Sequence, residues 1–265
     1  MPQDMARELI VRLADSEREL AAAQELRYRI FYTNMGAKPT AEMRRLERDF
    51  DEFDPFCDHL LIIDRAQGRG APKVVGTYRL LRSTRAEAAG GYYTAGEFDL
   101  SALDRYPGEH LELGRSCVDP DYRQGSVLQL LWKGIADYLV AHEISLMFGC
   151  ASFPGTNLAE MSQALSYLDA HHAAFPEWRP RAHADRYVSM ARLPKDAIDL
   201  RAAMREIPPL IKGYLRVGGV IGDGAVIDPE FNTVDVCLIV ESQLVPAKYV
   251  RHYTATAREQ FHADA

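Results

Sequence analysis

The chain has 265 residues, of which 47% are hydrophobic and 26% charged, and its formal charge is -7 at pH 7. This is the composition of a globular protein, so a disordered or collagen-like chain is excluded. The acidic balance argues against the broad positive field that binds nucleic acid, although a local basic patch can still bind an anionic partner.

The cysteine spacing and the apolar stretches indicate in which cellular compartment the protein lies. The four cysteines are far apart, without a Cys-x-x-Cys pair or the spacing of a zinc site, so we expect reduced thiols and no metal. Residues 1–14 mix charges into their apolar positions, which is atypical of a secretory signal. Apolar stretches at 127–141 and 144–153 are too short to span a bilayer. We expect a cytoplasmic protein that touches the inner face of the cytoplasmic membrane without crossing it.

The predicted elements begin with a strand at 8–13 and a helix opened by a capping box, Ser16-x-x-Glu19. Leu20, Ala23, Leu26 and Ile30 lie at helical spacing and predict its buried face. Strands are then predicted at 59–64, 73–81, 92–100 and 110–118. A polar turn at 119–125 and a second capping box, starting at Ser126, predict a helix to about residue 141.

The remaining elements complete an α/β (α+β) pattern. We predict a strand at 144–153, a helix from 157 to about 168, a strand at 186–193, a helix at 208–217, a glycine-rich connection at 218–224 and a strand at 234–240. Strands that meander first, with helices inserted later, predict a mixed, mostly antiparallel sheet covered by helices on both faces. We expect one domain over 1–265, with 195–265 as a C-terminal extension of the same core.

The turn before the second of these helices suits an anion. Gly125 precedes a helix start at Ser126 and Val127, where free N–H groups and the helix dipole favour phosphate. Arg123 can add two parallel hydrogen bonds. The alternative is that Gly125 and Ser126 only begin a helix.

This order of elements resembles the GCN5-related N-acyltransferase superfamily, whose members bind the phosphates of a thioester donor at such a turn. The superfamily favours Gln or Arg three residues before the glycine and Gly or Ala two residues after it. This chain has Tyr122 and Val127 there. The departure favours the single phosphate of an acyl carrier protein arm over the diphosphate of coenzyme A.

Scattered charges form a second candidate group. Arg79 and Glu112 lie inside apolar strands, where a charge is almost never buried without a partner. Arg27 has a simpler reading as a solvated helix edge, and the acidic loop with Asp51 and Asp54 has one as an exposed loop. Phe31 and Arg115 complete the group.

Residues 24–118 resemble acyl-homoserine-lactone synthases, which share the Arg-x-x-x-Phe helix, an acidic loop, a Gly-x-x-Arg strand and a Glu-x-x-Arg strand. Nearly the whole chain resembles bacterial L-ornithine N-α-acyltransferases. The resemblance rests on longer sequence stretches, such as Glu-Leu-Gly-Arg-Ser-Cys-Val at 112–118 and Phe-Gly-Cys-Ala-Ser-Phe-Pro-Gly-Thr at 148–156. That resemblance implies transfer of a 3-hydroxyacyl group from acyl carrier protein to the α-amine of L-ornithine, giving lyso-ornithine lipid. It implies no resident cofactor, since the thioester is carried on phosphopantetheine.

The chemistry of such a transfer suggests roles. Aminolysis of a thioester needs a neutral amine, so we expect Glu112 to act as general base, directly or through water. We expect Arg115 and Arg79 to hold the ornithine carboxylate or Glu112 itself, and Asp51 and Asp54 to hold the distal ammonium. Residues three apart on a regular strand face opposite sides, so sharing one site predicts a bulge, which we place at Gly114. Basic candidates for docking the carrier protein are Arg44, Arg45, Arg48, Arg123, Lys133, Lys212 and Arg216.

Two alternatives stay open. An acyl-homoserine-lactone synthase or another N-acyl amino acid synthase would ask for similar residues, because S-adenosylmethionine also presents an amine and a carboxylate. The region 208–240 looks foreign to those shorter synthases and favours ornithine. A non-catalytic module that binds acyl carrier protein predicts that Glu112→Gln changes no measurable behaviour.

Overall fold

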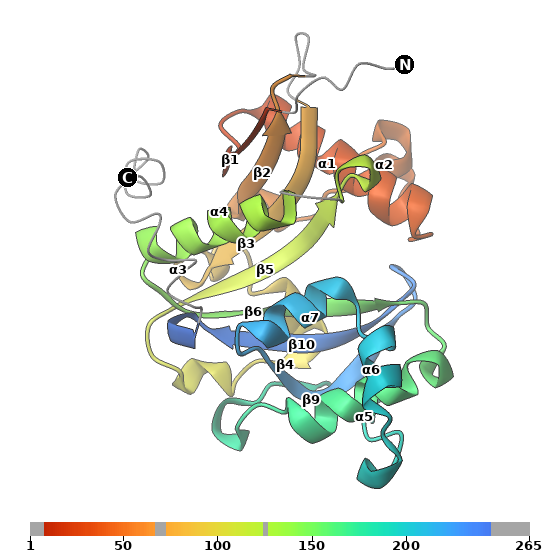
Figure 1. Ribbon diagram of the computed structural model, residues 1–265. Coiled ribbons are helices and arrows are strands. Elements are labelled where there is room, and N and C mark those ends of the chain that lie inside the picture. The colour runs from red at the N-terminus through yellow and green to blue at the C-terminus, as the bar shows by residue number, and fades with distance from the viewer. Residues whose placement is uncertain (1–7, 67–72, 124–126, 245–265) are drawn as a thin grey trace. The chain divides into compact units, whose positions relative to one another are not determined.

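A computed structural model describes residues 8–66, 73–123 and 127–244 of the chain (Figure 1). Gly125 and Ser126 of the predicted phosphate turn lie outside these ranges. The chain forms two compact units, each taken by itself below. Unit 1 contains described residues from 1–81 and 113–143, and unit 2 contains those from 82–112 and 144–246. Within the described ranges, no helix has the length and apolarity that crossing a membrane requires.

Unit 1 is a small sheet with a helix on each face. Its strands follow the order β1-β2-β3-β5, and β2 is antiparallel to both β1 and β3. The elements are β1 (Leu9–Leu13), α1 (Glu17–Tyr28), α2 (Ala41–Leu46), β2 (Asp58–Asp64), β3 (Lys73–Arg82), the end of β5 (Glu109–Val118) and α4 (Val127–Ala141). A π-helical turn, η1 (Arg29–Asn34), extends α1, and the short 3-10 turns η2 (Asp54–Phe56) and η5 (Pro120–Tyr122) lie in the connections.

Alternation along β2 explains the two helical layers. Leu61 and Ile63 belong to the core cluster under α1, whose helical members are Ala23, Leu26 and Ile30. The intervening Leu60 and Ile62 point to the opposite face, as successive strand residues do. There α4 packs so closely on β1 and β2 that a Cβ at Gly134 would lie 2.9 Å from Leu60. Figure 1 shows α1 and α4 on opposite sides of these strands. The predicted buried face of the first helix is thus confirmed for three of its four residues.

The first capping box is wrong, although the helix begins where it predicts. Ser16 is the N-cap of α1, yet its side chain makes no capping hydrogen bond. Glu19 instead receives both Nη groups of Arg12, at 2.6 and 2.5 Å. The charge-assisted pair with the guanidinium replaces the weaker reciprocal capping bonds.

Unit 2 continues with a larger mixed sheet of order β5-β6-β10-β9-β7-β4, and β8 pairs with β9. The β5–β6 and β7–β9 pairs are parallel, and the β6–β10, β9–β10, β4–β7 and β8–β9 pairs are antiparallel. Its strands are β4 (Phe98–Asp99), the start of β5, β6 (Ile144–Pro154), β7 (Arg181–Ala182), β8 (Tyr187–Val188), β9 (Val220–Asp228) and β10 (Thr233–Glu241). Its helices are α3 (Ser83–Ala86), α5 (Ser162–His171), α6 (Leu200–Glu206) and α7 (Pro209–Arg216).

Short 3-10 turns fill the connections of unit 2. They are η3 (Tyr93–Gly96), η4 (Leu103–Arg105), η6 (Leu158–Met161), η7 (Pro176–Trp178), η8 (Lys195–Ala197) and η9 (Ser242–Leu244). The core on one face of the sheet combines Phe148 of β6, Val226 of β9 and Ile239 of β10 with Phe98 and Leu103 from the segment before β5. The strands of the predicted C-terminal extension therefore belong to the sheet of unit 2.

Several predicted elements differ in unit 2. Residues 92–100 form η3 and the two-residue β4 instead of a full strand, and the predicted strand at 186–193 shortens to β8. The predicted connection at 218–224 contains the start of β9. The glycines at 222 and 224 look like loop residues in the sequence, but they belong to a bulge of β9. In this bulge residues 222–224 lie opposite the single residue Cys237 of β10. Gly224, with φ 82°, supplies the left-handed conformation that such bulges use.

Gly222 generates a prediction, because a Cβ at this position would lie 2.8 Å from the backbone oxygen of Pro180. That oxygen already accepts the N–H of Asp223 at 2.7 Å, so the backbone has little room to move. We expect Gly222→Ala to lower the free energy of unfolding by about 1–3 kcal/mol in urea titrations. The matched Gly96→Ala, where an added Cβ meets no atom within 4 Å, should stay within about 0.5 kcal/mol of the native chain. Equal values for both variants would contradict this account of the bulge.

Candidate functional site

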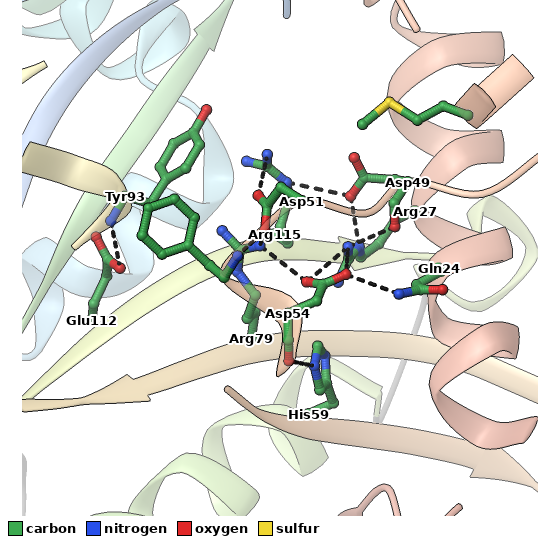
Figure 2. A network of polar contacts seen from close by, with 12 residues as sticks. Gln24, Arg27, Asp49, Asp51, Asp54, His59, Arg79, Tyr93, Glu112 and Arg115 are labelled. Carbon is green, nitrogen blue, oxygen red and sulfur yellow. Dashed lines mark hydrogen bonds and ion pairs between the residues drawn. The ribbon is translucent and has the colours of Figure 1, made fainter. Parts of the chain in front are cut away.

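The predicted ligand residue Arg27 is fully buried in unit 1, where carboxylates surround it (Figure 2). Its Nε donates to Asp49 Oδ2 at 2.6 Å, and its Nη2 donates to Asp54 Oδ2 at 2.8 Å. Removing an ion from water costs several kcal/mol unless partners of opposite charge satisfy it. The two carboxylates therefore permit α1 to carry an arginine on its buried side.

Asp51 joins two further arginines to this group. Arg79 Nη1 donates to Asp51 Oδ1 at 2.5 Å and to Asp54 Oδ1 at 3.0 Å. Arg115 Nη2 donates to Asp51 Oδ2 at 3.0 Å, and its Nε lies 3.3 Å from Asp49 Oδ2. Arginines and aspartates alternate through the group, and the formal charges cancel. We call these six residues, Arg27, Asp49, Asp51, Asp54, Arg79 and Arg115, the buried ion network.

The network keeps its carboxylates ionised. Burial alone would raise the pKa of Asp54, but the positive charges of Arg27 and Arg79 hold it well below its usual range. Burial opposes ionisation of Asp49 in the same way, and Arg27 and Arg115 keep its pKa low. Arg27 in turn has a raised pKa, because attraction to Asp49 and Asp54 outweighs its desolvation. All three groups are charged at neutral pH.

The strand that carries Arg115 departs from regular geometry at Arg115 itself, one residue after Gly114, where we predicted a bulge. Arg115 itself has φ 50°, in the left-handed region that a regular strand never uses. Gly114 lies beneath the guanidinium of Arg79, whose Nε would be 3.8 Å from an added Cβ. The departure from strand geometry thus falls where Arg115 turns toward Asp49 and Asp51.

The expected role of Asp54 in holding a distal ammonium needs correction. Its two oxygens receive hydrogen bonds from Arg27, Arg79 and Gln24, and its side chain is 4% exposed. A carboxylate accepts about four hydrogen bonds, so Asp54 has no capacity left for a ligand. Asp51 is more exposed, but Arg79, Arg115 and the N–H of Phe53 already bond to it.

Glu112, the predicted general base, belongs to unit 2 and is 4% exposed. Its Oε1 accepts the N–H of Thr94 at 2.6 Å, and its Oε2 accepts the N–H of Tyr93 at 3.1 Å (Figure 2). These bonds from η3 fix the carboxylate. A carboxylate held in one position in this way is suited to accept a proton.

The described residues beside the phosphate turn have different environments. Arg123 is exposed after η5, whereas Val127 is buried at the start of α4 near Gly76. A cavity of about 520 Å³ opens in unit 1, and its lining includes Arg29, Lys73 and Asp119. It lies beside the last described residues before the turn.

Sequence reasoning missed Asp49 and Gln24 in this region, whereas it predicted Phe31. Asp49 was assigned only to a loop, but it is fully buried and also accepts the hydroxyl of Tyr32 at 2.8 Å. Gln24 bonds to Asp54, and its spacing of three residues from Arg27 on one helix was the available signal. Phe31 is half-buried and packs beside the core under α1.

Two further features concern nucleophiles and cations. Burial raises the pKa of the Cys117 thiol to about 12, so this thiol is a poor nucleophile. Sequence reasoning also missed an acidic cluster in unit 2, formed by Glu97, Asp228 and Asp235, whose carboxylate oxygens lie within 4.8 Å of one another. These residues come from distant segments of the chain, so no sequence spacing predicts that their carboxylates lie close together.

The fold and comparisons with known proteins define the class. An acetyltransferase (GNAT) domain model matches residues 26–133, which include the entire buried ion network and Glu112. The structure of FeeM, an N-acyl amino acid synthase from uncultured soil microbes, shares the fold with a TM-score of 0.51 at 10% identity, covering 96% of this chain and 99% of that one. The protein is an acyltransferase with a GNAT domain.

Curated relatives extend the match along the chain. An L-ornithine N(alpha)-acyltransferase of Agrobacterium fabrum is 44% identical over 94% of this chain and 86% of its own length. One of Brucella abortus is 45% identical over 94% of this chain and 90% of its own length. The chain belongs to the L-ornithine N(alpha)-acyltransferase family.

The buried ion network predicts the result of neutralising its central cation. Arg27→Gln leaves Asp49 and Asp54 buried with too little positive charge, so we expect the free energy of unfolding to fall by about 3–5 kcal/mol. Arg48→Gln is the control, because Arg48 is partly exposed and its Nε lies 3.6 Å from Oε1 of the exposed Glu25. It should cost less than about 1 kcal/mol. Urea unfolding of both variants measures the difference, and a small loss for Arg27→Gln would show that the network does not support the fold.

Proposed function

We propose that the protein transfers a 3-hydroxyacyl group from acyl carrier protein to the α-amine of L-ornithine, forming lyso-ornithine lipid. The observation that carries the proposal is the identity of 43–45% to relatives of that name over at least 92% of the chain. The cytoplasmic location and a transient contact with the inner membrane surface belong to the same proposal, because the product is a lipid.

In this mechanism Glu112 accepts a proton from the α-amine. The amine nitrogen attacks the thioester carbonyl, a C–N bond forms, the C–S bond breaks, and the thiolate of phosphopantetheine leaves and takes up the proton from Glu112 as a thiol. The bonds from Tyr93 and Thr94 support this role, since they hold the carboxylate in one position before the amine arrives. Arg115 and Arg79 are proposed to act indirectly, by holding Asp49, Asp51 and Asp54 in the buried ion network.

The donor is proposed to bind through its phosphate at the start of α4. Arg123 is exposed there, and α4 directs its positive dipole end toward residues that precede Val127. The carrier protein is acidic, so its docking surface should be basic. Arg44 and Arg45 in the last turn of α2 are exposed and suit that contact.

A reconstituted reaction tests the proposal. Purified protein is incubated with 3-hydroxyacyl carrier protein and, separately, ornithine, lysine or S-adenosylmethionine, and the products are identified by mass and fragmentation. We expect acylation at the α-nitrogen of ornithine, and a slower reaction when acyl-coenzyme A replaces the carrier protein. Lactone formed from S-adenosylmethionine would assign the chain to homoserine-lactone synthesis. Acylation of no acceptor by folded protein would remove the enzymatic proposal.

The same assay examines the base. Glu112→Gln should lower kcat by about 10²- to 10⁴-fold, as loss of a general base does. Glu109→Gln is the matched control, because Glu109 lies on the same strand and also accepts a backbone N–H, that of Thr84 at 3.1 Å. Melting temperatures of both variants separate lost chemistry from a displaced η3. Full turnover by Glu112→Gln would exclude the carboxylate as base.

A further inference from the structure

The acidic cluster of unit 2 concentrates negative charge inside the protein. Glu97, Asp228 and Asp235 are 4%, 6% and 5% exposed, and their carboxylates lie within 4.8 Å of one another. Arg186 is a cation beside the cluster, and its Nη2 lies 3.6 Å from Glu97 Oε1. Burial, and then the charge of Asp235, raise the pKa of Glu97 to about 7. The cluster is therefore electrostatically strained, and a positive ligand would relieve it.

A buried hydroxyl beside the cluster points to the same kind of ligand. Thr233 is 2% exposed, and its Oγ1 has no hydrogen-bond partner within the described part of the chain. In the β9–β10 register Thr233 lies directly opposite Asp228, and Asp235 follows two positions along β10. Residues opposite each other, and residues two apart on a strand, share a face of the sheet. The Thr233 hydroxyl thus lies on the same face of the sheet as the carboxylates of Asp228 and Asp235.

One turn connects this cluster to the proposed base. The N–H of Thr94 donates to Glu112, and the carbonyl of Thr94 accepts the N–H of Glu97 at 3.1 Å. The buried thiol of Cys237 in β10 has a raised pKa, caused by burial first and then by the charges of Glu112 and Glu97. Both carboxylates therefore act on the same part of unit 2.

We propose that Glu97, Asp228 and Asp235, with Thr233, bind the distal ammonium of the diamino acid acceptor. This inference rests on the proposed acylation of ornithine and names the side-chain specificity site for it. The network residues Asp51 and Asp54 are held by arginines, which leaves the unit 2 cluster as the better acceptor of a substrate cation.

An ammonium resembles the donors that already contact the site. The Asp228 Oδ1 accepts the N–H groups of Glu230 and Phe231, at 2.7 and 3.1 Å, so its orientation is fixed by the turn. Glu97 already has a nitrogen cation beside it, because Arg186 Nη2 lies 3.6 Å from its Oε1. Apolar Val226, directly opposite Asp235, can contact the methylene chain of the acceptor.

The test compares L-ornithine with L-norvaline, which has the same carbon skeleton without the distal amine. Titration calorimetry on the full chain measures binding, and the acyl-transfer assay measures KM. We expect the native protein to prefer ornithine, and Glu97→Gln and Asp235→Asn each to reduce the ratio of the two affinities at least about tenfold. The control Glu230→Gln removes an exposed carboxylate next to the same turn and should leave the ratio intact.

Each other outcome has a definite meaning. Equal losses for both ligands would make the cluster structural, and an unchanged ratio would exclude it as the ammonium site. Mg²⁺ or Mn²⁺ binding that both variants abolish would identify a metal site instead. If ornithine binds with the expected ratio but no acyl group is transferred, the proposed function fails and this inference stands. A native protein that binds ornithine no better than norvaline overturns the inference even if the variants fail to fold.

Discussion

The burial of Arg27 is the constraint on which unit 1 depends. A guanidinium with no exposed surface needs carboxylates around it, and the loop between α2 and β2 supplies Asp49 and Asp54. The same carboxylates then require cations on their other side, which Arg79 and Arg115 provide from β3 and β5. Helix, loop and sheet are thereby held by one set of charges, because removing any member leaves the remaining buried charges unbalanced.

The charges of unit 1 and those of unit 2 have different surroundings. Arg27, Arg79 and Arg115 of unit 1 form ion pairs with Asp49, Asp51 and Asp54. In unit 2, backbone N–H groups hold the carboxylate of Glu112, and a thiol and one partly exposed arginine contact Glu97. A carboxylate held in place by backbone N–H groups keeps its negative charge, which can attract an amine. The reaction that we propose therefore uses Glu112, which one of the shared motifs contains, and the acidic cluster, which none of them contains.

The sequence predicted what local patterns determine. Helical spacing located the buried side of α1, and the order of strands and helices indicated the GNAT class, which the comparisons confirm. Local patterns failed where tertiary contacts decide. The glycines at 222 and 224 look like a loop but bulge within β9, and residues 92–100 have strand-like composition but form η3 to fix Glu112. Partners such as Arg27 and Asp49 are 22 residues apart, and no spacing rule pairs them.

A crystal structure of the protein with L-ornithine tests the central claim most directly, since it shows which carboxylates meet the two amino groups. The account predicts the α-amine within hydrogen-bond reach of Glu112, directly or through one water, and the distal ammonium among Glu97, Asp228 and Asp235. It also predicts that the contacts of Arg27 with Asp49 and Asp54 remain as they are without ligand. An ornithine ammonium bound to Asp51 or Asp54, with Arg79 displaced, would contradict it.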